Sequence, residues 1–208
     1  MRRELKELLD RFGDEGTAPG STQTIAWHAH REAEHLRDRT MVDELVEFVA
    51  HERDRWRRNA AYFIIGKIGQ SLSDPTCAEV MIGWLGREKV KFNLSCLLDR
   101  IGDISKPATV DLSSVYALMG DARWLVRRAA IAALKRSENP EAERRVLAHL
   151  ANGTDPYDII ECNATLNDIG TARAIPFLEA NLKSRKRDVR GSAKFALESI
   201  RARAAAGA

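Results

Sequence analysis

The chain has 208 residues, and 33 Lys and Arg against 30 Asp and Glu leave a net charge of only +3, although 30% of the residues are charged. This balance excludes a disordered, tail-like chain and a strongly polyanionic or polycationic protein. An apolar fraction of 44% is enough for a sizeable core, but no run of about 18 apolar residues supports a membrane span. The charged N-terminus lacks the apolar stretch of a secretory signal, so we predict a cytoplasmic protein without a membrane partner.

Residues 1–38 predict an N-terminal helical cap or a degenerate repeat. Residues 2–11 form a short amphipathic helix in this interpretation, and residues 24–37 form another. The Gly, Pro, Ser and Thr residues of segment 13–22 predict a loop between them. Leu5, Leu8 and Leu9 are the expected buried stripe of the first helix.

A polar cluster in the second of these helices resembles part of a metal site. His28, Glu32 and His35 share one face of a helix, and Glu32-x-x-His35 has the spacing used in di-iron helical bundles. Such a site needs a second Glu-x-x-His, which the sequence lacks. We therefore predict a solvated polar face and no metal or cofactor, with metal binding at these three residues left as an open alternative.

An internal repeat of helix pairs occupies residues 39–203. Apolar residues recur at i, i+3, i+4 and i+7 in five segments, whose first members are 33, 36, 32 and 31 residues apart. The segments are Ala61/Ile64/Ile65/Ile68, Leu94/Leu97/Leu98/Ile101, Ala130/Ala133/Leu134/Ser137, Cys162/Thr165/Leu166/Ile169 and Ala193/Ala196/Leu197/Ile200. This spacing is typical of one face of an amphipathic helix and does not fit a strand.

A shorter stripe at i, i+3 and i+4 precedes each of these segments and predicts a first helix in every pair. The stripes are Val46/Val49/Ala50, Met81/Trp84/Leu85, Val115/Leu118/Met119, Leu147/Leu150/Ala151 and Leu178/Asn181/Leu182. A single pair cannot bury its stripes, so stacked pairs must form a continuous core. We predict an all-α fold, a right-handed α–α superhelix of about five helix–turn–helix repeats, followed by a frayed tail at residues 204–208.

Proline and glycine positions mark the expected ends of these helices. Three prolines are expected at the starts of first helices: Pro75, Pro107 and Pro140. Pro176 is expected to bend another first helix or to mark its first turn. Three glycines are expected to end second helices in the left-handed conformation: Gly69, Gly102 and Gly170.

The residues that open the second helices resemble the HEAT-repeat consensus, in which an Asp and an Arg or Lys precede Ala, Ala-Leu and Ile-Gly. Asp188 and Arg190 open the last segment in this way, and the segments that follow Asp54 and Asp121 are similar. The resemblance covers about residues 40–203. It implies a HEAT-like solenoid in which the second helices line a concave surface.

Basic and aromatic residues gather where the second helices begin. Arg58, Arg127 and Arg190 are candidates for pairing with acids of neighbouring repeats, as the HEAT resemblance implies. The candidate partner-binding groove comprises Trp56, Arg57, Arg58, Trp124, Arg127, Arg128 and Arg190. Because aromatic and Arg side chains often carry interface energy, we predict a non-catalytic scaffold or adaptor that presents this groove to a protein of unknown identity.

A nucleic-acid partner is the alternative for the same groove. Residues 124–131 resemble a segment of DNA alkylation-repair glycosylases built from HEAT-like repeats, which implies DNA binding and base excision. Glu88 and Asp121 are the acids considered for the catalytic position, but they fit an inter-helix turn and a helix N-cap better. The sequence contains no Gly-x-Ser-x-Gly or Ser-x-x-Lys motif, so we assign no catalytic residue. Three cysteines are expected as small buried residues: Cys77, Cys96 and Cys162.

Overall fold

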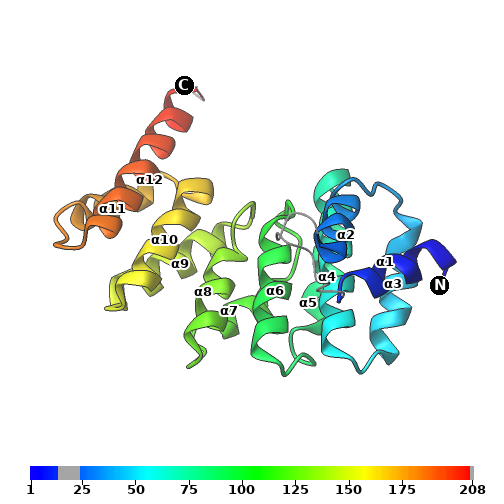
Figure 1. Cartoon of the computed structure of the whole chain (residues 1–208). Helices are drawn as coiled ribbons and strands as arrows, with labels where there is room; N and C mark the ends of the chain where they lie inside the picture. Colours follow the sequence, from blue (N-terminus) through cyan, green and yellow to red (C-terminus); the bar gives the residue numbers. More distant parts are fainter. Residues whose placement is uncertain (14–23, 207–208) are drawn as a thin grey trace. The chain divides into compact units, whose positions relative to one another are not determined.

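The computed structural model describes residues 1–13 and 24–206. In these residues the chain forms twelve α-helices, one short 3-10 helix and no β-strand beyond an isolated bridge (Figure 1). The all-α prediction is therefore confirmed. The helices divide into two compact units, Met1–Ile104 and Ser105–Ala208. Apart from Gly13, the segment predicted as a loop lies outside the described residues.

Unit 1 is organised around one long helix. Its helices are α1 (Arg3–Arg11), α2 (Ile25–Glu34), α3 (Thr40–His51), α4 (Arg55–Leu72), α5 (Pro75–Trp84) and α6 (Lys91–Gly102). Helix α4 packs against each of the other five. The predicted stripe of α1 is buried at Leu5, Leu8 and Leu9, so the N-terminal helices share the core of this unit.

Unit 2 has α10 at its centre. Its elements are α7 (Ser113–Leu118), α8 (Trp124–Ala132), α9 (Pro140–Asn152), α10 (Pro156–Ile169), the 3-10 helix η2 (Ala172–Ala174), α11 (Ile175–Asn181) and α12 (Arg187–Ala206). Helix α10 packs against α8, α9 and α12. Helix α12 continues to Ala206, beyond the expected end of the repeats at residue 203.

The odd-numbered helices from α3 to α11 are the first helices of the repeats, and the even-numbered helices from α4 to α12 are the second helices. All residues of the five predicted second-helix stripes are buried except Ser137 and Ile169, which are half-buried. The first-helix stripes are less accurate. Helix α3 buries Val42, Leu45 and Val49, whereas Ala50 is exposed. Its apolar residues cover more than one face, and the packing against α4 selects the buried one.

The glycine prediction is wrong. Gly69 lies inside α4, and the residue with a left-handed backbone after this helix is Ser73, with a φ of 52°. Gly170 has an extended backbone, and Gly102 is the last residue of α6. A Cβ on Gly69 would lie 2.6 Å from the Cβ of Cys77, so this glycine serves the close approach of α5 to α4.

Two helix boundaries in unit 2 differ from expectation. Pro107 lies in a turn well before α7, whereas Pro75, Pro140 and Pro176 occupy the first turns of their helices. Helix α8 ends at Ala132, although the predicted stripe continues to residue 137.

The segment that follows α8 binds Lys106, which lies 29 residues before Lys135 in the sequence. The backbone N–H of Lys106 donates to the carbonyl of Arg136 over 2.8 Å, and its ammonium donates to the carbonyl of Lys135 over 2.7 Å. Arg136 takes a left-handed backbone with a φ of 56°. The segment therefore turns away to bind Lys106 instead of continuing the helical hydrogen-bond pattern.

Candidate functional site

An arginine at the same position of three second helices holds the turn that precedes its own helix. Arg58 Nη1 donates to the carbonyl of Arg53 over 2.8 Å, and Arg127 Nη1 donates to that of Asp121 over 3.0 Å. Arg190 Nη1 donates to the carbonyl of Ser184 over 2.9 Å. These guanidinium groups close the connection between the first and second helix of each repeat.

Two of these arginines also bind an acid of the next repeat, as predicted. Arg58 Nε lies 3.1 Å from Glu88 Oε2, and Arg127 Nε lies 2.5 Å from Asp158 Oδ2. Both acids are buried, so each pair connects neighbouring repeats within its unit. Arg190 lies in α12, the second helix of the last repeat, and the hydrogen bonds recorded for its side chain go to the backbone of its own turn.

Asp54 and Asp155 cap second helices, as the repeat pattern indicates. Asp54 accepts hydrogen bonds from the N–H groups of residues 56 and 57, and Asp155 accepts one from that of residue 157. Asp121 is not a cap: α8 has Arg123 at its N-cap position, and Asp121 binds the N–H and guanidinium of Arg123. The Asp121 carboxylate therefore stabilises the turn that precedes α8.

Arg128 is bound internally, although the sequence indicates a ligand-facing residue. Its Nε lies 2.9 Å from Asp158 Oδ1, and its Nη2 lies 3.0 Å from Asp155 Oδ2. The guanidinium carbon is 4.7 Å from the centre of the Trp124 ring and 4.9 Å from that of Tyr157. Two carboxylates and two aromatic rings therefore fix this arginine and leave the rings exposed.

Arg57 is also engaged within the chain. Its Nη2 lies 3.1 Å from Asp10 Oδ1, and its Nε lies 3.5 Å from Glu52 Oε2. The guanidinium carbon is 5.3 Å from the centre of the Phe48 ring. Arg57 thus connects α4 to α1 and α3, a contact that no local sequence pattern indicates.

Four second helices begin with an exposed aromatic side chain. Trp56, Phe92, Trp124 and Tyr157 are 61%, 60%, 56% and 64% exposed, and each lies in the first two residues of its helix. Arg55 lies 4.8 Å from the Trp56 ring centre, and Lys91 lies 5.0 Å from that of Phe92. Trp56 and Trp124 are predicted from the sequence, whereas Phe92 and Tyr157 are not. Tyr157 precedes the buried stripe of its helix by five residues, as Trp56 does, and this shared spacing would have indicated it.

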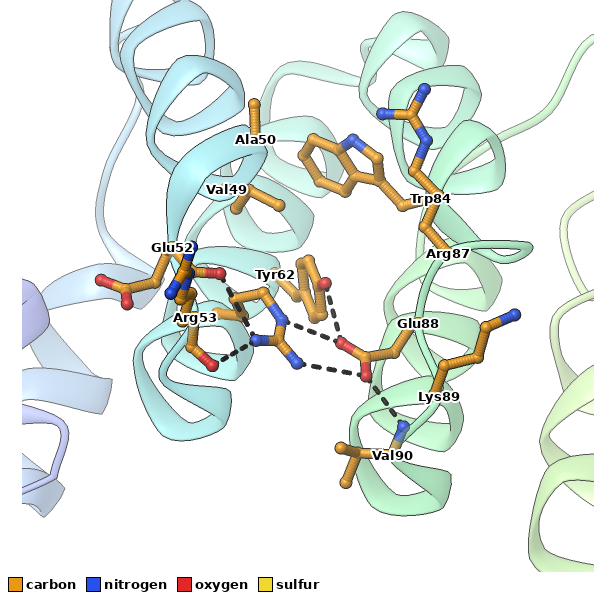
Figure 2. A pocket seen from close by; sticks show the side chains of 11 residues that line it. Val49, Ala50, Glu52, Arg53, Tyr62, Trp84, Arg87, Glu88, Lys89 and Val90 are labelled. Atoms are coloured by element: carbon orange, nitrogen blue, oxygen red, sulfur yellow. Dashed lines mark hydrogen bonds and ion pairs between the residues drawn. The ribbon is translucent and has the colours of Figure 1, made fainter.

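A pocket of about 400 Å³ lies in unit 1 between α3, α4 and the connection from α5 to α6 (Figure 2). Val49, Tyr62 and Trp84 form apolar parts of its wall, and the Tyr62 and Trp84 ring centres are 5.5 Å apart. The Trp84 ring points toward Val49 from the opposite side (Figure 2). A pocket of this size can accommodate a side chain or a small ligand.

Glu88 is the buried acid of this pocket. Its carboxylate accepts hydrogen bonds from Arg58 Nε over 3.1 Å, from the Tyr62 hydroxyl over 3.1 Å and from the Val90 N–H over 2.9 Å (Figure 2). Burial opposes ionisation of Glu88, but the hydrogen bonds from Arg58 and Val90 outweigh it and lower the pKa of Glu88. Burial and the neighbouring Glu88 raise the pKa of Tyr62, which therefore remains a protonated donor.

The polar cluster of α2 does not converge on one point. Glu32 accepts a hydrogen bond from Arg11 over 2.6 Å. Among residues 1–13 and 24–206, no group of three or more His, Cys, Asp or Glu side chains is arranged to hold a metal ion. Cys77 and Cys162 are buried as predicted, whereas Cys96 is half-buried. In the same residues, no helix is both long and apolar enough to cross a membrane.

Comparisons with known proteins agree with the repeat pattern. Residues 112–198 match the family described as HEAT repeats. No curated protein sequence matches the chain. A designed armadillo repeat protein is similar in structure, with a TM-score of 0.52 and 15% identity over 94% of this chain and 99% of that chain. An engineered protein from the Northeast Structural Genomics Consortium has a TM-score of 0.53 and 17% identity over 97% and 98% of the two chains. At these low sequence identities, the similarity supports the fold alone.

Proposed function

Because this chain is a HEAT-like repeat protein with a helical solenoid fold, we propose that it is a non-catalytic scaffold or adaptor that presents a concave surface to a protein partner. The observation that carries the proposal is the exposed aromatic side chain at the start of four second helices. Large exposed rings cost free energy in water and supply much of the binding energy at protein interfaces. Their recurrence in the first two residues of four second helices favours a shared binding role.

The predicted groove residues divide into two roles in this proposal. Trp56 and Trp124 contact the partner, together with Phe92 and Tyr157. Arg128 positions the rings of Trp124 and Tyr157, and Arg58 and Arg127 connect neighbouring repeats. Arg57 connects α4 to α1 and α3, and Arg190 holds the turn before α12. The internal ion pairs of Arg58, Arg127 and Arg128 support this division, because a guanidinium bound to a buried carboxylate is not free for a ligand.

Site-specific photocrosslinking tests the scaffold function. Benzoylphenylalanine introduced at position 56 or 157 is expected to crosslink a discrete protein in an extract of the source cells. Matched controls are positions 79 and 144, which are exposed on the first helices α5 and α9. Equal crosslinking at all four positions, or none at positions 56 and 157, would contradict the proposal.

DNA binding through the same surface remains the alternative. The glycosylase resemblance requires free cations near residues 124–131, but the arginines there are ion-paired and leave fewer cations for phosphates. Glu88, one of the acids considered for catalysis, accepts hydrogen bonds from Arg58 and Tyr62. A labelled DNA duplex titrated at about 50 and 200 mM salt separates the two functions, since the logarithm of a phosphate-dependent affinity falls by roughly 0.9 per contact with each tenfold rise in salt. Submicromolar binding that is lost at the higher salt would replace the scaffold function with DNA binding.

A further inference from the structure

We propose that the pocket of unit 1 binds an acidic segment of the partner, with an apolar side chain inside the pocket and carboxylates at its rim. This inference rests on the proposed scaffold function and names the chemistry of the partner at one site. The pocket is the opening between α3, α4 and residues 85–90 (Figure 2).

The interior of the pocket favours an apolar group. Val49 and Trp84 are 8% and 9% exposed, and the Tyr62 ring packs beside Trp84. Ala50, which the helix leaves exposed, lies beside Val49 on the same side (Figure 2). An inserted aliphatic side chain would remove apolar surface from water on both partners, at about 25 cal/mol per Å².

The polar groups in the interior are already satisfied. Glu88 accepts hydrogen bonds from Arg58, Tyr62 and Val90. The Arg58 guanidinium also donates to the carbonyls of residues 52 and 53. A ligand therefore does not need to supply hydrogen bonds to these groups. The negative charge of Glu88 is neutralised by Arg58.

The rim of the pocket carries three exposed cations and the carboxylate of Glu52, which binds Arg57 and the N–H of Asp54. Arg53, Arg87 and Lys89 line the pocket and are exposed, and no ion pair is recorded for them among the described residues. Arg53 lies on the side of α3 and α4, whereas Arg87 and Lys89 come from the connection before α6 (Figure 2). Cations on both sides of an apolar opening are complementary to a segment with carboxylates on both sides of an apolar residue.

A protein segment fits this site better than a nucleic acid does. Single-stranded nucleic acids bind by stacking bases on exposed aromatic rings. Trp84 is only 9% exposed and Tyr62 only 2%, so neither offers a face on which a base can stack. The exposed Trp56 does not line this pocket.

The test uses the full chain and a short labelled peptide in which one leucine is flanked on each side by glutamates. Fluorescence anisotropy is expected to show saturable binding that weakens at higher salt. Replacing the glutamates by glutamine, or the leucine by serine, is expected to weaken binding about tenfold each. Equal affinity of the glutamine peptide would overturn the inference, and this comparison requires no variant of the protein.

A charge reversal then locates the site. Arg87→Glu combined with Lys89→Glu is expected to lower the affinity for the peptide at least about tenfold. The matched control is Arg185→Glu with Lys186→Glu, two exposed cations of unit 2, which is expected to change it less than about twofold. Equal losses in both variants would show a general charge effect and overturn the site. Circular dichroism verifies the helical content of each variant.

The outcomes distinguish this inference from the scaffold function. Crosslinking at positions 56 and 157 without peptide binding would retain the scaffold and reject the acidic ligand of the pocket. Peptide binding without crosslinking would reject the scaffold surface and retain the pocket. A labelled DNA duplex that binds more tightly than the peptide, and loses affinity with the same Arg87→Glu and Lys89→Glu variant, would overturn the choice of a protein segment.

Discussion

Units 1 and 2 place an arginine at the same position of the repeat but place its acidic partner differently. In unit 1, Arg58 binds Glu88, which lies in the connection before α6. In unit 2, Arg127 binds Asp158, which lies inside α10. The arginine therefore lies at the same position in both repeats, whereas its acidic partner comes from a different position in each.

This difference decides which cations are available to a ligand. Asp158 and Asp155 also bind Arg128, so both neighbouring arginines of unit 2 are neutralised. In unit 1 two acids that line the pocket bind arginines of α4: Glu88 binds Arg58, and Glu52 binds Arg57. No ion pair is recorded among the described residues for Arg87 and Lys89, which line the same pocket. The same repeat thus yields a closed ionic network in one unit and a pocket with a basic rim in the other.

Removal of the two acids should give the largest effect and a clear difference between the units. Glu88→Ala leaves Arg58 without a carboxylate and is expected to lower the free energy of unfolding by about 3 kcal/mol. Asp158→Ala is expected to cost less, because Asp155 still contacts Arg127 and Arg128. Urea unfolding followed by circular dichroism measures both variants. An equal or larger loss for Asp158→Ala would contradict the comparison.

Glycine substitutions should destabilise both units, through close helix packing at Gly69 and through the end of its own helix at Gly170. Gly69→Ala is expected to lower the free energy of unfolding by about 1–3 kcal/mol, because its Cβ would lie 2.6 Å from Cys77 Cβ. Gly170→Ala should be at least as destabilising, since its Cβ would clash with the Leu166 carbonyl oxygen at the end of α10 and would lie 2.8 Å from Ile200 Cδ1.

The matched control is Gly83→Ala in α5, where no atom lies within 4 Å of the added Cβ. This variant should raise the melting temperature, because alanine is a better helix former by about 1 kcal/mol. If Gly69→Ala behaved like Gly83→Ala, the assigned role of Gly69 in helix packing would be wrong.

The aromatic rings should stabilise unit 2 slightly more than unit 1. Trp124→Ala and Tyr157→Ala each remove one ring from Arg128, and each is expected to cost about 0.5–1 kcal/mol. The loss of unfolding free energy in the double variant should differ from the sum of the two single losses, since both rings contact one guanidinium. Trp56→Ala removes a ring contacted by the exposed Arg55 and should change stability less. Additivity of the two unit 2 variants would argue against a shared contact with Arg128.

The smallest effect concerns the acid of the turn before α8. Hydrogen bonds from Arg123 lower the pKa of Asp121 to about 2 despite some desolvation, and the hydrogen bond from its side chain contributes more than the one from its N–H. An ordinary Asp has a pKa of about 3.9, so this carboxylate stabilises the folded state above that pH and loses its contribution as the pH falls toward 2. Carboxyl NMR titration should show this midpoint, and Arg123→Ala should raise it toward the ordinary value without reaching it, because the N–H of residue 123 still donates to the carboxylate. A midpoint near 4 in the unmodified protein would contradict the contact.

The second helices were predictable from sequence because their apolar residues lie on one face with the period of a helix. Ile64, Ile65 and Ile68 illustrate this, since all three are fully buried. The first helices were less predictable, because α3 has apolar residues on several faces and only its contact with α4 selects Val42 and Leu45. The end of α8 also escaped prediction, since Lys106, from a distant part of the sequence, binds the carbonyl groups of residues 135 and 136, which follow the helix.

The candidate site was predictable only in part. Trp56 and Trp124 stand out because each follows an arginine at the start of a repeated helix. The partners of the arginines do not stand out: Arg57 binds Asp10 in the N-terminal helix, and Arg128 binds Asp155 and Asp158 in the next repeat. Charge along the sequence says how many cations exist, but not which of them an acid neutralises.

The all-α class, the period of the repeat, the second-helix core and the arginines of the helix starts can all be predicted from the spacing of residues along the chain. These features follow from spacing within a few turns of one helix, where neighbours along the chain are also neighbours in space. Tertiary structure alone decided the buried faces of the first helices, the role of Gly69, and the pocket between Trp84 and Val49. Each of these depends on contacts between residues that are distant in sequence, because packing and ion pairing act through space.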